Sequence, residues 1–320
     1  MVPDDPPAPS RFASMTLRAR TWLPLLLTAL LTGCFGGSKP DARLDNAVPV
    51  LAAKPRIGLA LGGGAAKGFA HIGVIKMLEA SGIHVDAVSG TSAGSVVGVL
   101  YASGMDAFQL QETAFSLDEG KIRDVRFFSG GMVQGQKLQD YVNDLLKNTP
   151  IEKLRTPFAA VATELETGER AIFVRGNAGQ AVRASSSIPG VFEPVEINGK
   201  HFVDGGVVSP VPVDAARQLG ADIVIAVDIS ARPDGSNPAG MVGIVGQSIT
   251  IMGRKLAEQE LRRADIVIRP KVGQIGPTDF DQKNVAILEG ERAALAAIPA
   301  IKAKIAEKTA AMGKPPIPAR

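Results

Sequence analysis

Apolar and polar positions along the chain follow two patterns, short runs rich in Val, Ile and Ala and longer stretches with helical spacing of apolar residues. The short runs predict strands at 57–61, 85–88, 158–163, 170–174, 223–227 and 266–268. The longer stretches predict helices at 68–80, 106–117, 135–147, 180–186, 213–219, 241–263 and 283–308. Strands that alternate with helices are typical of an α/β domain with a mainly parallel central sheet flanked by helices.

Two hairpins interrupt this alternation. Asn198-Gly199 lies within the run 196–203, and this dipeptide strongly favours a two-residue hairpin turn. Glu166-Thr167-Gly168 separates two of the predicted strands in a similar way. We therefore expect a hairpin at each of these places.

The composition is that of a folded protein. Of the 320 residues, 45% are hydrophobic and 21% are charged, which supports a large buried core and excludes disorder. The formal net charge is +3, and part of the basic excess lies in the N-terminal leader and the C-terminal tail. No compact cluster of Lys and Arg with interleaved aromatic residues occurs, so we expect no nucleic-acid partner.

The N-terminal region has the features of a secretory signal. Arg18 and Arg20 precede the apolar run Trp22–Leu31, and small residues lead into Cys34, the only cysteine of the chain. This order resembles the lipobox of bacterial lipoproteins, in which the cysteine is acylated and becomes the new N-terminus. A short membrane anchor, or a buried helix with an incidental cysteine, is the alternative. The run is short for a spanning helix, which needs about 20 apolar residues, and Pro24 interrupts it.

These features predict four parts of the chain. Residues 1–33 form a lipoprotein signal peptide, with 1–14 as an upstream extension if translation begins at Met15. Residues 34–54 are a flexible tether rich in Gly, Pro and Ala, 55–310 are one folded domain, and 311–320 are a tail. We therefore expect a protein of the bacterial cell envelope, anchored to a membrane by a lipid on Cys34.

The most specific local motif is Gly90-Thr91-Ser92-Ala93-Gly94, a G-x-S-x-G between a predicted strand and a predicted helix. Glycines in this motif permit the tight turn that presents a nucleophilic serine at the strand end. The dipole of the following helix favours negative charge beside Ser92. A structural alternative also exists, because small residues one turn apart allow close packing of a helix. The strand-turn-helix context favours catalysis.

A serine nucleophile needs a base, and the order of residues points to an aspartate. An α/β-hydrolase triad runs Ser, then Asp or Glu, then His, whereas His71 and His84 precede Ser92 and His201 lies on the strand that enters Asp204. We therefore expect no catalytic histidine. Asp204 begins an Asp-Gly-Gly sequence at a strand end, and burial would raise its pKa and make it a better base.

The third motif is the glycine-rich loop Gly62–Gly68 between the first predicted strand and helix. It does not fit a nucleotide loop, because a Walker A sequence requires Ser or Thr after the lysine, and Lys67 is followed by Gly68 and Phe69. A loop of this kind can present N–H groups to an acyl oxyanion instead.

The three motifs together resemble the patatin-like phospholipases, whose signature is a G-x-G-x-x-[RK]-G loop, a G-x-S-x-G and a D-G-[GA] in that order. They correspond to Gly62–Gly68, Gly90–Gly94 and Asp204–Gly206, and the similarity covers roughly residues 55 to 230. Further similar segments are 69–73, 184–192 and 210–213. The resemblance implies a patatin-like three-layer architecture.

The resemblance also assigns roles. It implies that Ser92 and Asp204 form a catalytic dyad and that Lys67, in place of the more frequent Arg, supports an anion site. It assigns the oxyanion hole to the amides of Gly62, Gly63 and Gly64. It implies no cofactor, and no metal-ligand spacing occurs in the sequence.

The expected activity is hydrolysis of lipid acyl esters, of the phospholipase A or lysophospholipase type. The alternatives are a thioesterase or general carboxylesterase, and a non-catalytic lipid-binding lipoprotein on the same fold. The expected partners are a lipid or acyl-ester substrate and a membrane surface. The sequence identifies neither protein partners nor the physiological acyl donor.

Overall fold

The structure is a computed structural model that describes residues 54–117, 133–230 and 240–313. All of them belong to one compact unit, Leu51–Arg320. The predicted signal peptide, the lipidation site Cys34 and most of the predicted tether lie outside the described residues.

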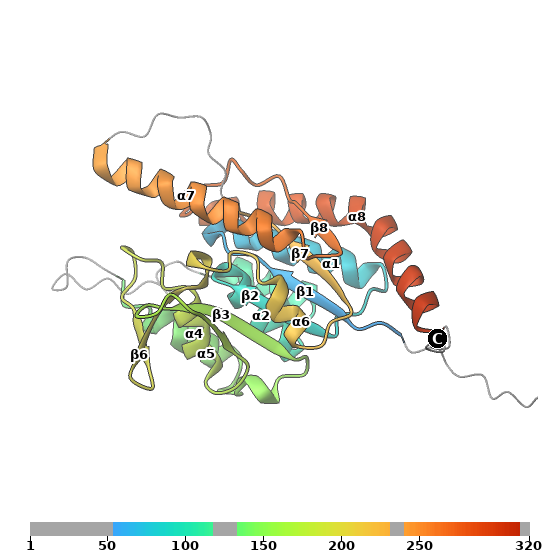
Figure 1. Cartoon of the computed structure of the whole chain (residues 1–320), viewed down its shortest axis with the longest axis horizontal. Coiled ribbons are helices and arrows are strands. Elements are labelled where there is room, and N and C mark those ends of the chain that lie inside the picture. The colour runs from blue at the N-terminus through green and yellow to red at the C-terminus, as the bar shows by residue number, and fades with distance from the viewer. Residues whose placement is uncertain (1–53, 118–132, 231–239, 314–320) are drawn as a thin grey trace, which may run out of the picture. The chain divides into compact units, whose positions relative to one another are not determined.

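An eight-stranded sheet forms the centre of the domain (Figure 1). Its order is β5 (Val195–Ile197), β6 (Lys200–Asp204), β3 (Phe158–Glu164), β2 (Ala87–Thr91), β1 (Ile57–Leu61), β7 (Ile223–Val227) and β8 (Ile266–Ile268), and β4 (Arg170–Phe173) pairs with β3. The pairs from β3 through β2, β1 and β7 to β8 are parallel. The pairs that β3 forms with β4 and β6, and the pair of β5 and β6, are antiparallel.

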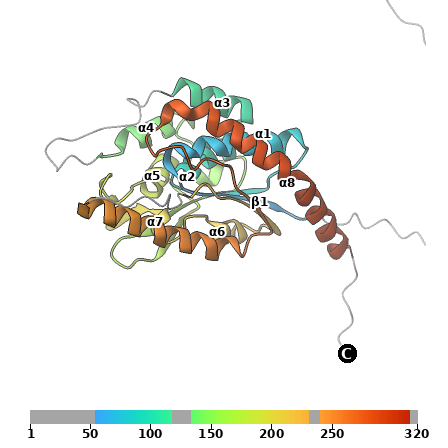
Figure 2. The same cartoon turned by 90° about the horizontal axis from the view of Figure 1, so that it is seen from above.

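Helices cover both faces of this sheet. They are α1 (Ala70–Ala80), α2 (Ala93–Ser103), α3 (Ala107–Ser116), α4 (Gln136–Leu145), α5 (Ala178–Ser185), α6 (Val213–Gln218), α7 (Gly240–Leu261) and α8 (Lys283–Met312). Short 3₁₀ helices are η1 (Ala65–Phe69), η3 (Ile151–Lys153), η4 (Gly205–Val207) and η5 (Phe280–Gln282). Figure 2 shows α1, α3 and α8 on one side of the sheet and α6 and α7 on the other.

The buried residues of the central strands divide between the two faces. Leu59 and Leu61 of β1 belong to the large core cluster under α1 and α8, whereas Ala60 between them packs into a smaller cluster with α6 and α7. Successive side chains of a strand point to opposite faces, so a strand covered on both sides is apolar throughout. The predicted α/β fold with a mainly parallel sheet in three layers is confirmed.

Strand β2 lies later in the sequence than predicted, at Ala87–Thr91 in place of 85–88. The small polar residues near its end are buried because their hydroxyls have backbone partners. The Ser89 hydroxyl donates to the Pro212 carbonyl, and the Thr91 hydroxyl donates to the Ser209 carbonyl. The sequence of β2 resembles a loop, but tertiary hydrogen bonds make it a central strand that runs up to Ser92.

Among the helices of the described residues, none combines the length and the apolar character needed to cross a membrane.

Candidate active site

The register of strand β3 brings Ser92 and Asp204 together. Thr91, at the end of β2, pairs in parallel with Val161 of β3. Asp204, at the end of β6, pairs in antiparallel fashion with Ala162, the next residue of β3. Ser92 follows Thr91, so β3 lies between the two strand ends that carry the predicted catalytic residues and sets them at the same level of the sheet.

Ser92 occupies a strained turn between β2 and α2. Its φ is 53° and its ψ is −126°, a left-handed φ that is rare for a residue with a side chain. The glycines on either side are required by close approach. A Cβ on Gly90 would collide with the backbone of Gly94 and Ser95, and a Cβ on Gly94 would collide with the Leu61 carbonyl. The turn has the geometry that lifts a nucleophilic serine from the end of a strand.

A second serine fixes this turn. The Ser92 N–H donates to the Ser185 hydroxyl at 2.9 Å, and that hydroxyl donates to the Val161 carbonyl at 2.6 Å. Ser185 is fully buried at the end of α5. No role was predicted for it from the sequence, although a run of three serines in an otherwise apolar region was a signal for buried polar contacts.

Asp204 is buried, and its carboxylate accepts a hydrogen bond of 2.7 Å from the Gly206 N–H. The Ser92 hydroxyl lies close enough to this carboxylate to favour its ionised form. Burial raises the pKa of Asp204 from its usual value to about 6, and the interactions with Ser92 and Gly206 oppose that rise. A carboxylate with this pKa is ionised at neutral pH and is a stronger base than an exposed aspartate.

The backbone of Asp204 is equally fixed. Its N–H donates to the Ser187 carbonyl at 2.8 Å, and its carbonyl accepts from the Thr163 hydroxyl at 2.9 Å. These bonds connect β6 to β3 and to the end of α5. The position of the carboxylate relative to Ser92 is therefore set by the sheet.

Each of the three histidines has its partner elsewhere. His71 is fully buried in α1, with Nε2–H donating to the Gly62 carbonyl at 2.8 Å, and burial lowers its pKa to about 4. His201 bonds to Glu166 at 2.6 Å, and His84 lies exposed at 3.8 Å from Asp86. None of these contacts involves Ser92.

The predicted oxyanion loop lies against the nucleophile, and its amides differ in what they bind. A Cβ added to Gly63 would lie 3.2 Å from the Cβ of Ser92. The Gly62 N–H donates to the Val227 carbonyl and the Gly63 N–H to the Pro210 carbonyl, each at 3.0 Å. Two of the three predicted donors are thus already paired. Within the described residues, the Gly64 N–H has no acceptor.

The start of helix α2 offers another donor. Ser92 is the residue before the helix, and Ala93 is its first residue. The Ala93 N–H has no acceptor among the described residues, as is usual for the first N–H groups of a helix. In serine hydrolases with this turn, the N–H that follows the nucleophile contributes to the oxyanion hole.

Lys67 lies in η1 and is largely buried. Burial lowers the pKa of its ammonium from the usual value, because desolvation disfavours the charged form. Lys67 does not line the cavity beside Ser92. The structure thus places this cation in the glycine-rich loop, and its role at an anion site stays a prediction.

A buried glutamate that was not predicted from the sequence clamps the segment after Asp204. Glu260 of α7 accepts a hydrogen bond of 2.5 Å from the Ser209 hydroxyl and one of 2.8 Å from the Val211 N–H. Burial raises the pKa of Glu260 to about 7. Because the Pro210 carbonyl in the same segment holds the Gly63 N–H, Glu260 acts on the glycine loop through the backbone.

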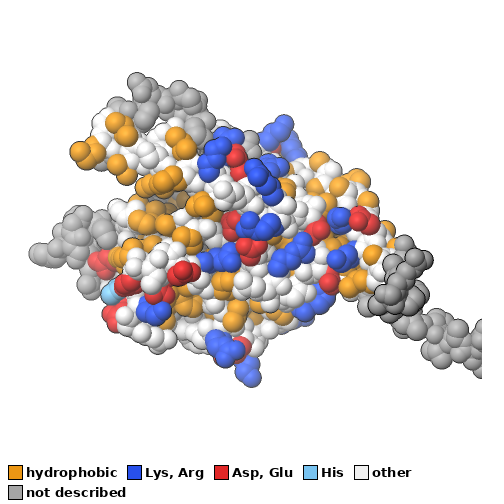
Figure 3. All heavy atoms as spheres, in the orientation of Figure 1, with side chains coloured by type: hydrophobic (Ala, Val, Ile, Leu, Met, Phe, Trp, Pro, Cys, Tyr) orange, Lys and Arg blue, Asp and Glu red, His pale blue; other side chains and the backbone are white. Residues whose placement is uncertain are grey.

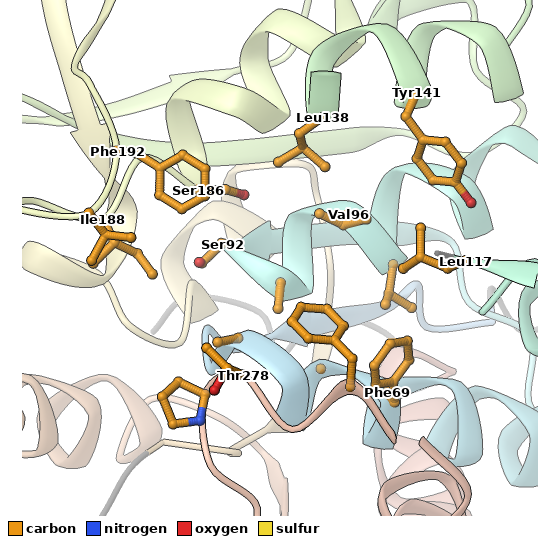
Figure 4. Close-up of a pocket in the computed structure, with 17 residues that line it drawn as sticks. Phe69, Ser92, Val96, Leu117, Leu138, Tyr141, Ser186, Ile188, Phe192 and Thr278 are labelled. Atoms are coloured by element: carbon orange, nitrogen blue, oxygen red, sulfur yellow. The ribbon is translucent and has the colours of Figure 1, made fainter. Parts of the chain in front are cut away.

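An apolar cavity of about 290 Å³ opens beside the nucleophile. Figure 4 shows the Ser92 hydroxyl facing the side chains of Ile188 and Phe192. Other lining residues are Phe69, Val96, Val97, Leu117, Leu138, Tyr141, Val191 and Phe280. Such a lining suits a hydrocarbon chain, because apolar groups leave water when they enter it.

Within the part of the chain that the structure describes, no three His, Cys, Asp or Glu side chains gather in a way that could hold a metal ion.

Comparisons with known proteins agree with this arrangement. A family model described as patatin-like phospholipase matches residues 59–217, which include the glycine loop, Ser92 and Asp204. An uncharacterized NTE family protein of Mycobacterium tuberculosis is 38% identical over 185 residues, 57% of this chain and 51% of that protein. Patatin-like phospholipase domain-containing protein 7 of Mus musculus is 32% identical over 186 residues, 56% of this chain and 14% of that protein.

The fold has a relative among solved structures. The crystal structure of VipD from Legionella pneumophila matches with a TM-score of 0.54 and 15% identity, over 78% of this chain and 67% of that chain. This likeness concerns the fold alone. The chain spans about half the length of the mycobacterial relative, 51% of it. From the matched family model and the sequence relatives, the chain belongs to the patatin-like phospholipase family.

Proposed function

We propose that the protein is a serine hydrolase of lipid acyl esters, of the phospholipase A or lysophospholipase type, with Ser92 as nucleophile and Asp204 as its base. One observation carries this proposal. The hydroxyl of Ser92 lies beside the buried carboxylate of Asp204, whose pKa is raised to about 6, and at the edge of an apolar cavity. Family membership supports lipid ester hydrolysis in general terms.

In the first half of the reaction, Asp204 accepts the hydroxyl proton as Ser92 Oγ forms a bond to the ester carbonyl carbon. The carbonyl π electrons move to the oxygen and create an oxyanion. When the carbonyl re-forms, the bond to the alkoxy group breaks, and Asp204 returns its proton to the departing alcohol. In the second half, Asp204 takes a proton from water as the water oxygen bonds to the acyl carbon. When the bond between that carbon and Ser92 Oγ breaks, Asp204 returns the proton to Oγ, and the fatty acid leaves.

For the oxyanion we assign the N–H groups of Gly64 and Ala93. The described residues give neither group an acceptor, whereas Gly62 and Gly63 use theirs within the fold. The positive end of α2 adds to the stabilisation of negative charge at this point. Of the three amides predicted from the sequence, only that of Gly64 remains in the proposal.

The cavity supports a hydrocarbon-bearing substrate. Its lining is almost entirely apolar, and Ser92 and Ser186 are among its few polar residues. A fatty acyl chain that lies in this cavity would bring its ester carbonyl to Ser92. The proposed location, a lipid-anchored protein of the bacterial cell envelope, rests on the lipobox-like sequence at Cys34.

The test is an ester hydrolysis assay with p-nitrophenyl butyrate and with lysophosphatidylcholine. The wild-type chain is compared with Ser92→Ala and Asp204→Asn, and with Ser103→Ala, whose hydroxyl bonds only to the Leu100 carbonyl of its own helix. We expect both dyad variants to lose activity on both substrates and Ser103→Ala to retain it. Activity on the soluble ester alone would indicate a general carboxylesterase. Full activity in either dyad variant would exclude this mechanism.

A further inference from the structure

The first half of helix α7 carries an exposed apolar surface. Among its described side chains, the exposed large hydrophobic ones are Met241, Ile244, Val245, Ile249, Ile251 and Met252, with exposed fractions from 45% to 82%. No charged residue occurs from position 240 to position 253. Most of these side chains recur at helical spacing along one side of α7, opposite the side that buries Ala257 and Glu260 further along. We call them the α7 apolar face.

The two hydroxyl groups within this stretch bond to carbonyls of the same helix. The Ser248 hydroxyl donates to the Ile244 carbonyl at 2.8 Å, and the Thr250 hydroxyl donates to the Gly246 carbonyl at 3.0 Å. Side chains bonded in this way can leave water without losing a hydrogen bond. The surface is therefore compatible with a hydrocarbon environment.

The second half of α7 is different. Ala257, Glu260 and Leu261 are buried against the domain, and the exposed positions become Lys255, Gln259 and Arg262. The outer face of one helix thus changes from apolar to charged after Gly253. A change of this kind within one helix is typical of an element that crosses from an apolar phase into water.

The topology puts the α7 apolar face at the catalytic edge of the sheet. Strand β7 runs parallel to β1, whose carboxyl end leads into the glycine loop, and α7 returns the chain to β8, which is also parallel. The first half of α7 is therefore on the side of Ser92. With 22 residues α7 is about 33 Å long, whereas the five residues of β7 span about 17 Å, so the helix extends past the sheet (Figure 1).

The space-filling view shows the result. In Figure 3, hydrophobic side chains cover the projecting end of α7 and continue across the hollow beneath it. Basic side chains gather over the other half of the helix in the same view. The family model ends at residue 217, so α7 lies outside the part of the chain that it matches.

We propose that the α7 apolar face docks on the surface of a lipid bilayer and holds the opening beside Ser92 against it. This inference rests on the proposed function, because a lipid ester substrate lies in such a surface. The charges beside the face favour a bilayer over a second copy of the chain. Arg254, Lys255 and Arg262 outnumber Glu258, with which the first two form ion pairs, so the net charge beside the face is positive. Two copies joined side by side with parallel α7 helices would bring these like charges together. Anionic lipid headgroups would attract them.

The experiment measures sedimentation of the full chain with vesicles. It uses Cys34→Ala, which removes the predicted acylation site, and Ser92→Ala, which prevents hydrolysis of the vesicle. The α7 triple variant carries Val245→Gln, Ile249→Gln and Met252→Gln, because glutamine has a good helix propensity. The matched control, the α8 triple variant, carries Val285→Gln, Leu288→Gln and Leu295→Gln. These side chains are exposed by 40%, 44% and 59% on α8.

We expect the parent chain to bind vesicles of phosphatidylcholine, and to bind more tightly when phosphatidylglycerol is included at low salt. The partition coefficient of the α7 triple variant from water onto vesicles should be at least about tenfold lower. The reason is that three apolar side chains, which would leave water on binding, are replaced by polar ones. The α8 triple variant should bind as the parent does. Failure of the parent to bind, or an equal loss in both triple variants, would overturn the proposal.

Two further measurements separate the alternatives. Sedimentation velocity without lipid should show a monomer, and a dimer that the α7 triple variant dissolves would assign the face to a second copy instead. In the chain that retains Ser92, the α7 triple variant should hydrolyse p-nitrophenyl butyrate at the parental rate but vesicle lipid at least about tenfold more slowly. Absence of all ester hydrolysis would reject the proposed function, while the binding result would still test the docking surface.

Discussion

Two buried carboxyl groups lie near the catalytic edge of the sheet, and only one of them is placed to act on a substrate. Asp204, at the end of β6, and Glu260, on α7, are both nearly inaccessible to water. Burial raises the pKa of each, to about 6 for Asp204 and to about 7 for Glu260. By burial and pKa alone, Glu260 would be the better general base.

Their partners distinguish them. The Asp204 carboxylate lies beside the Ser92 hydroxyl, which faces an apolar cavity. Glu260 uses both carboxylate oxygens to hold the Ser209 hydroxyl and the Val211 N–H, and it does not line the cavity. A raised pKa therefore marks a buried carboxyl group, and the neighbouring nucleophile decides whether that group takes part in the chemistry.

The largest expected effect comes from removing each carboxylate in turn. Asp204→Asn should lower kcat for p-nitrophenyl butyrate by about 10³-fold or more, because no other base reaches Ser92. Glu260→Gln should lower it by less than about tenfold, since the introduced amide would still bond to the segment that holds the Gly63 N–H. Steady-state kinetics on both purified variants checks this contrast. Equal losses in the two variants would remove the distinction drawn between the two carboxyl groups.

The second effect is on the pH dependence of activity. Asp204 must be ionised to accept a proton, so kcat/KM should rise with pH and level off above its pKa of about 6. Below that point the rate should fall about tenfold for each pH unit. Glu260→Gln should leave this inflection in place. A rate profile that instead shifts with Glu260→Gln would show that Glu260 is the titrating base.

The third effect is on stability, and its sign follows from the same pKa. A folded-state pKa above the unfolded value means that the folded protein binds the proton more tightly, so stability falls as pH rises from about 4 to about 6. Asp204→Asn removes this penalty. Its free energy of unfolding should exceed that of the wild type by about 1–3 kcal/mol at pH 8 and by less at pH 5. Urea unfolding at both pH values measures the difference, and a destabilised variant at pH 8 would contradict the raised pKa.

The smallest expected effect concerns the serine that fixes the nucleophile turn. Ser185→Ala leaves the Ser92 N–H and the Val161 carbonyl without their partner, which should cost about 1–3 kcal/mol of stability. Activity should fall about three- to tenfold, as the position of Ser92 is held less firmly. Ser103→Ala is the matched control. An unchanged unfolding free energy in Ser185→Ala would show that water replaces the hydroxyl.

Local signals in the sequence were sufficient to predict most elements and to single out Ser92 and Asp204, which the fold brings together. Three ordered glycine-containing motifs identify Ser92 and Asp204, and the Asn198-Gly199 turn between β5 and β6 lies where it was predicted, with positive φ at both residues. Helical spacing predicted α7 and α8 to within a few residues. In each case neighbouring residues alone determine the structure.

The rest depends on contacts between distant parts of the chain. Glu260 lies among Arg, Lys and Glu residues and resembles a solvent-exposed helix position, and only the packing of α7 buries it against Ser209. The end of β2 is polar, and its burial depends on carbonyl partners more than a hundred residues away. The pairing of the Gly62 and Gly63 amides likewise depends on β7 and on Pro210. No local pattern carries this information.

The most direct test of the central claim is covalent labelling of the nucleophile with a fluorophosphonate, followed by peptide mass spectrometry. In the reaction a bond forms between Ser92 Oγ and phosphorus, fluoride leaves, and Asp204 accepts the proton. We expect one label, on the peptide that contains Ser92, with a labelling rate that rises through pH 6 and is lost in Asp204→Asn but kept in Glu260→Gln. A label on another serine, or undiminished labelling of Ser92 in Asp204→Asn, would contradict the assignment of this dyad.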